Sequence, residues 1–187
     1  MIRLSGKSGS STRFEISNDG WKYWEAHQES GVERIEAEVR RLLDPAANVG
    51  PYASAFARWK EAEAMLWQDR DGEHWVTEVG HVCREAMQAF AAAFCAEQGQ
   101  AVTSGPSNTV DRIRAGLDTL RERLPEAYAA FYDAVLAYWG TVSDLVQRLE
   151  HGAGREGEPT DWDDARLVVT QTAMVMTELM RASGRGR

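Results

Sequence analysis

The sequence has few of the residues and motifs that would point directly to a function, and cysteine is one of the scarce residues. Only two cysteines, Cys83 and Cys95, occur in 187 residues. If both lie on one helix, their Cα atoms are about 18 Å apart, whereas a disulfide needs a separation of about 7 Å or less. The two thiols therefore cannot pair with each other. Free thiols are typical of a reducing compartment, and we expect a cytoplasmic protein.

Long hydrophobic runs and nucleotide-binding motifs are missing as well. No stretch approaches the roughly 18 apolar residues of a membrane span. The N-terminal segment MIRLSGKSGSSTR has no apolar run long enough for a signal peptide. Glycine-rich phosphate loops and Gly-x-Ser-x-Gly motifs are also absent. We therefore expect no membrane contact and no cofactor.

The charge is acidic overall and unevenly placed. The formal net charge is −8, yet residues 1–13 and 181–187 contain only basic charged residues. The acidic middle of the chain is a poor platform for phosphate backbones. Contact with nucleic acid is therefore expected, if at all, only through the basic ends. The simpler interpretation of those ends is that they are solvated tails.

Apolar residues at helical spacing dominate the rest of the chain. Hydrophobic residues make up 43% of the sequence and charged residues 27%, which suits a protein with a sizeable core. The pattern predicts helices at about residues 30–43, 51–67, 73–98, 109–124, 126–151 and 160–182. Short connections between them favour an all-α bundle of about six helices.

The ends of the chain interrupt this helical pattern. Residues 1–11 are rich in glycine and serine, and we expect a flexible N-terminus. A single helical domain should span residues 12–182, with an internal boundary at the 99–108 loop, and residues 183–187 should form a flexible basic tail. Alternation at residues 12–17 before Asn18-Asp19-Gly20 predicts a short N-terminal β-hairpin. A helix beginning near Asp19 is the alternative.

The helix expected at 73–98 carries the most polar chemistry inside an apolar pattern. His74, Glu78, His81 and Glu85 fall on one helical face, and such side chains can hold a metal. A di-metal bundle needs two Glu-x-x-His motifs on facing helices, and only one is present here. The alternative is a polar flank in which Arg84 pairs with an acid on a neighbouring helix. Gly80 would allow a close helix crossing beside His81.

The size, the helix count and the segment HVCREAMQAF resemble uncharacterised all-helical bacterial proteins of phage-defence and toxin–antitoxin loci, including HEPN-like domains. The resemblance implies a ribonuclease or a non-catalytic partner of one. The catalytic signature of that group is an arginine and a histidine with four to six residues between them. Arg70 and His74 have three residues between them, and Arg148 and His151 have two, so neither pair matches. Arg70, His74 and His81 remain the candidates for a displaced site.

Two parts of the chain suggest partner binding. Trp21 and Trp24 lie near the N-terminus, and aromatic residues dominate interface hot spots. The last helix contains Met174, Met176 and Met180 and is apolar on more than one side, which favours burial on two faces, either within the fold or by a partner.

We therefore expect a non-enzymatic bacterial protein that binds a protein partner or itself, in a phage-defence or toxin–antitoxin system. A HEPN-like ribonuclease and a metal-binding bundle are the alternatives. Cys83 is expected in the core, because free cysteines are usually buried.

Overall fold

The computed structural model describes residues 2–8, 11–16, 50–67, 74–101, 105, 108–123, 125–151 and 160–185. The chain divides into two units, Met1–Arg40 and Arg41–Arg187. The predicted partner residues Trp21 and Trp24 and the helix predicted at 30–43 lie outside the described residues.

Two antiparallel strands form the described part of the first unit. Strand β1 spans Ile2–Ser8 and β2 spans Ser11–Ile16, with Ile2 opposite Ile16 and Ser8 opposite Ser11. The predicted hairpin turned instead at residues 18–20, which are not described, so it is not confirmed. Strand β2 lies close to the first strand that we expected, at residues 12–17. It pairs with β1, which lies in the segment 1–11 that we expected to be flexible.

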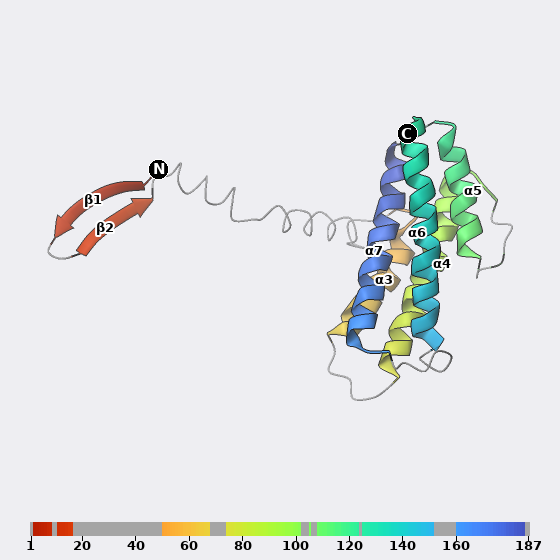
Figure 1. The fold of residues 1–187 in the computed structure, drawn as a ribbon, viewed down its shortest axis with the longest axis horizontal. Coiled ribbons are helices and arrows are strands. Elements are labelled where there is room, and N and C mark those ends of the chain that lie inside the picture. Colours follow the sequence, from red (N-terminus) through yellow and green to blue (C-terminus); the bar gives the residue numbers. More distant parts are fainter. Residues whose placement is uncertain are drawn as a thin grey trace. The chain divides into compact units, whose positions relative to one another are not determined.

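The second unit is an all-helical bundle, as predicted (Figure 1). Its described helices are α3 (Ala53–Leu66), α4 (Trp75–Glu97), α5 (Thr109–Arg121), α6 (Glu126–His151) and α7 (Trp162–Arg185). These five lie close to the predicted ranges, whereas a bundle of six is not confirmed. No described helix has both the length and the apolarity needed to cross a membrane.

Local sequence explains where α5 and α7 begin, whereas a contact distant in sequence accounts for the end of α7. The Asn108 side chain accepts a hydrogen bond from the backbone N–H of Asp111 and caps α5. Asp161 and Asp164 exchange side-chain and backbone hydrogen bonds at the start of α7. The predicted stop at Ser183 is wrong. Ser183 is buried and donates to Glu97 at 2.6 Å, and this contact holds the last turn in the bundle.

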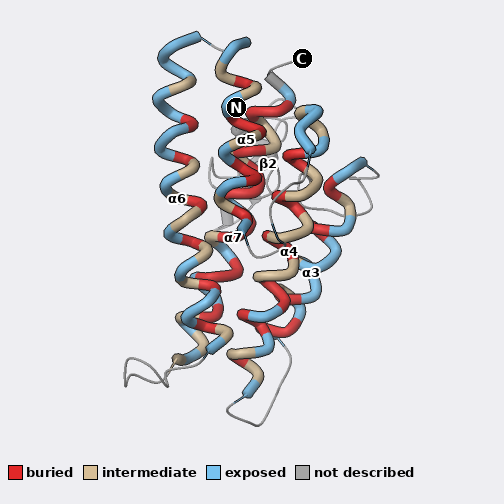
Figure 2. Tube along the Cα trace, turned by 90° about the vertical axis from the view of Figure 1, so that its right-hand side faces the viewer, coloured by how far each residue is buried: buried red, intermediate tan, exposed pale blue. Residues whose placement is uncertain are grey.

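Helix α4 is the centre of the bundle, because it packs against each of the other four described helices. Figure 2 shows buried residues along the inward face of every helix. The α4 residue Phe90 is fully buried, and its ring centroid lies 4.8 Å from that of Tyr52 and 5.7 Å from that of Trp139. The Trp139 indole donates to Thr109 Oγ1 at 3.0 Å, so this large side chain is buried with its polar atom paired.

Helices α4 and α6 lie in close contact at Gly80. A Cβ atom at this position would lie 2.5 Å from the backbone nitrogen of Glu150 and 2.9 Å from the carbonyl carbon of Leu149. Real Cβ atoms do not come that close to backbone, so only glycine fits without moving a helix. The close crossing expected beside His81 is therefore confirmed.

We predict that Gly80→Ala lowers the free energy of unfolding by about 1–3 kcal/mol, because the added methyl group must push α6 away. Gly140→Ala in α6 is the matched control, since a Cβ there meets nothing within 4 Å. That variant should gain up to about 1 kcal/mol from helix propensity. Urea unfolding of both variants measures the difference, and equal stabilities would contradict the crossing.

Candidate functional site

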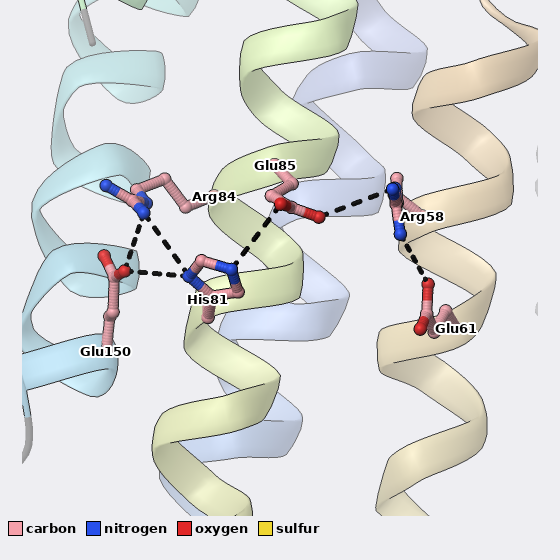
Figure 3. A network of polar contacts seen from close by, with 6 residues as sticks. All are labelled: Arg58, Glu61, His81, Arg84, Glu85 and Glu150. Carbon is pink, nitrogen blue, oxygen red and sulfur yellow. Dashed lines mark hydrogen bonds and ion pairs between the residues drawn. The ribbon is translucent and has the colours of Figure 1, made fainter.

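A chain of polar contacts runs from α3 across α4 to α6 (Figure 3). His81 lies between two carboxylates, with Nε2 3.5 Å from Glu85 and Nδ1 3.1 Å from Glu150. On the other side, Glu85 is 3.5 Å from Arg58 of α3. The polar flank of α4 therefore links three helices.

The most buried part of this network is the contact between Arg84 and Glu150. The Arg84 guanidinium lies 2.9 Å from the Glu150 carboxylate, whose side chain is only 13% exposed. This is the predicted pairing of Arg84 with an acid on a neighbouring helix. A cavity of about 170 Å³ adjoins the pair, with Met87 and Val146 among its apolar lining residues and Gln88 among its polar ones. The pair fixes how α4 and α6 are aligned.

The four candidate metal ligands of α4 do not form one cluster. His81 and Glu85 meet, whereas His74 and Glu78 are exposed at the start of the helix. The His74 carbonyl accepts a hydrogen bond from Thr77 Oγ1 at 2.6 Å. Within the described ranges, no group of three or more histidine, cysteine or acidic side chains is placed to hold a metal ion.

The structure describes two of the three candidate ribonuclease residues, His74 and His81. Arg70 lies outside the described residues, and His74 is exposed at the first turn of α4. His81 is 3.3 Å from Arg84, but Glu85 and Glu150 contact the same imidazole. A histidine that acts as a general base must reach the proton it abstracts. Here both ring nitrogens already face carboxylates.

The methionines of α7 point in different directions. Met176 is fully buried, Met180 is half-buried and Met174 is 49% exposed. Of the predicted partner residues that the structure describes, Met174 is therefore the most accessible. Sequence reasoning counted Leu167 among the apolar residues of this helix but did not single it out for partner binding, and it is 46% exposed one heptad before Met174. The seven-residue spacing of Leu167 and Met174, opposite the buried stripe, is the signal that could have found it.

These two residues belong to a continuous outward surface, which we call the α7 face. Its members are exposed or half-exposed and share one side of the helix: Asp163, Arg166, Leu167, Thr170, Met174, Glu178 and Arg181. An open hollow of about 310 Å³ lies on it, lined by residues that include Leu167 and Gln171.

Large apolar side chains of other helices are exposed as well. Trp67, at the end of α3, is 70% exposed and packs edge-on against Trp162 at 5.9 Å between ring centroids. The Arg166 guanidinium lies 5.4 Å from the Trp162 ring centre. Phe131 of α6 is 46% exposed. The aromatic group at Trp67 and Trp162 therefore adjoins the α7 face through Arg166.

Comparison of the chain with protein-family models, with curated proteins and with solved structures finds no match in any of the three. The roles of these surfaces therefore rest on their residues and geometry.

The buried thiol of Cys83 should make the stability of the fold depend on pH. Burial raises the pKa of this thiol from 9.0 to about 12, although a hydrogen bond with Thr172 acts in the opposite direction. Above pH 9 the unfolded chain loses the proton and the folded chain keeps it, so stability falls as pH rises, by up to about 1.4 kcal/mol per pH unit from this group. Urea unfolding at pH 9 and pH 10 should show a steeper loss for the wild type than for Cys83→Ala. Equal slopes would contradict the assignment.

The buried end of the polar network gives another prediction. Glu150→Gln should lower the free energy of unfolding by about 1–2 kcal/mol, because Arg84 and His81 lose a charged, largely desolvated partner. Glu61→Gln is the control, since Glu61 is 54% exposed and pairs with Arg58 within α3 at 3.2 Å. That change should cost about 0.5 kcal/mol or less. Thermal unfolding of both variants tests the difference, and a Glu61→Gln cost as large as that of Glu150→Gln refutes it.

Proposed function

We propose that this chain is a non-enzymatic protein-interaction module and that the α7 face is its contact surface. The observation that carries the proposal is the exposure of Leu167 and Met174, 46% and 49%, on a helix whose opposite side is already buried by the bundle. Burying these side chains against a partner removes apolar surface from water, which is the main driving force of protein association.

The layout of the α7 face supports this role. Apolar side chains lie along its middle, and charged residues lie at both ends, with Asp163 and Arg166 at one end and Glu178 and Arg181 at the other. Protein interfaces commonly have an apolar centre within a polar rim. Trp67 adds an exposed aromatic anchor near the first end, and tryptophan is among the residues most often found at binding hot spots.

The chemistry of the remaining candidates favours a binding role over catalysis. Both ring nitrogens of His81 contact carboxylates, and burial raises the pKa of Cys83 so far that a thiolate is unfavourable. A nucleophilic cysteine needs the opposite, a lowered pKa and access to substrate. We place the module in the bacterial cytoplasm, since both cysteines are free thiols, and we propose a defence or toxin–antitoxin system as its setting on the sequence pattern of HVCREAMQAF alone.

Photo-crosslinking in the cells that naturally make the protein tests this function. A photoreactive phenylalanine at Met174 should give one defined crosslinked species, because the side chain is at the centre of the proposed contact. The same residue at Arg114, an exposed position on α5, is the control and should give none. Leu167→Ser should weaken the Met174 crosslink, since it removes apolar area from the contact.

Mass spectrometry then identifies the crosslinked chain. Crosslinking at Met174 that is no stronger than at Arg114, or that persists unchanged in Leu167→Ser, refutes the α7 face as the contact surface.

A further inference from the structure

We infer that the partner of the α7 face is a second copy of the same chain, with the two α7 helices packed antiparallel about a two-fold axis at the level of Thr172 along the helix. The inference rests on the proposed function, because it uses the same face. It adds the identity of the partner and the register of the contact. The order of charges along α7 carries it.

Charged residues of opposite sign lie at equal distances on either side of Thr172 along the α7 face. Asp163 and Arg181 are each nine residues from this position, and Arg166 and Glu178 are each six. In an antiparallel two-fold pair, residues at equal distances on opposite sides of the axis come to the same level along the helices. Asp163 therefore meets Arg181 of the partner subunit, and this contact occurs twice.

The inner charged pair follows the same rule. Arg166 comes to the level of Glu178 of the partner subunit, and both side chains are long enough to reach across a helix pair. All four charged contacts are thus between opposite signs. A parallel pair would instead place Asp163 beside Asp163 of the partner subunit, with like charges repelling. The charge order selects the antiparallel register.

The apolar residues fall where such a pair needs them. Thr170 and Met174 each lie two residues from Thr172. Thr170 therefore comes to the level of Met174 of the partner subunit, and this contact occurs twice. Leu167 lies beside this pair on the same face. Met174 is therefore covered at the centre of the contact, Leu167 lies one residue inside the level of the Arg166 pair, and the outermost charged pairs lie at the rim.

The overall charge explains why a copy can approach at this face. Two chains of net charge −8 repel each other over most of their surface. The α7 face has two acidic and two basic residues and is neutral. Arg181 lies 2.9 Å from Glu178 within the same helix, and both side chains are more than a third exposed, so solvent reaches part of each.

Charge reversal on α7 tests the register. Asp163→Arg and Arg181→Glu each place like charges opposite one another at both ends of the pair, and each should raise the dimer dissociation constant by about 100-fold. The double variant with both changes restores opposite charges and should dimerise like the wild type. A mixture of the two single variants should form a heterodimer for the same reason. Sedimentation equilibrium of the full chain measures each constant.

Matched controls keep the net charge change equal. Glu122→Arg and Arg123→Glu alter exposed residues at the end of α5, which packs on α4 and α6, and both should leave the dimer unchanged. Circular dichroism shows that each variant is folded.

A cysteine pair gives a readout that does not depend on charge. Thr170→Cys mixed with Met174→Cys should form a disulfide-linked heterodimer under mild oxidation, whereas the native cysteines are buried.

The outcomes separate the inference from the proposed function. A wild type that stays monomeric at millimolar concentration overturns self-association, and a crosslink from Met174 to a different protein would then leave the α7 face as a contact surface. A wild-type dimer that neither single variant weakens overturns this register, as does a double variant that fails to recover. Weakening by both singles with recovery in the double variant and in the mixture supports the inference.

Discussion

The close approach of α4 and α6 at Gly80 is the constraint on which the bundle depends. With no side chain at this position, the α6 backbone at Leu149 and Glu150 lies directly against α4. The next turn of α4 then carries Arg84 and His81 to within 2.9 Å and 3.1 Å of the Glu150 carboxylate. A larger residue at 80 would separate these groups, so the apolar crossing and the polar network are one arrangement.

The contacts at this crossing give a structural explanation for the polar flank of α4, the stripe that contains His81, Arg84 and Glu85. Imidazole and carboxylates on one helical face could serve a metal or a proton transfer, but here they face carboxylates and guanidinium groups of α3 and α6. A half-buried ion pair contributes little net stability, because desolvation offsets much of the attraction. What such a pair does well is to penalise wrong alignments, in which a charge would be left without its partner. The stripe therefore ties α4 to α3 and α6, and the proposed contact surface lies on α7 instead.

The sequence predicted the described helices well and the exposed face of α7 poorly, for physical reasons. Helical periodicity and turn residues are local signals, so helices α3 to α7 appear near their expected positions. Gly80 and Arg84 were also interpreted correctly, because a glycine inside an apolar stripe and an arginine on the polar flank beside it both indicate a neighbouring helix. Which side of α7 faces solvent depends on where α3, α4 and α6 pack. Two residues separate exposed Met174 from buried Met176, and composition alone cannot rank them. The end of α7 was missed because Ser183 is held by Glu97, a contact distant in sequence.

The size of the α7 face limits how strong its contacts can be. Its inner side is already used by the bundle, and two large apolar side chains with a charged rim cover much less area than the roughly 1,600 Å² of a standard interface. A contact of this kind dissociates readily and depends on concentration and salt, because its rim pairs are exposed and screened. The alternation of charge then matters more than the apolar area. Weak apolar attraction alone would let the α7 face bind many partners. The order of its charges restricts binding to a surface with the complementary order. A second α7 in the antiparallel orientation has that order by symmetry.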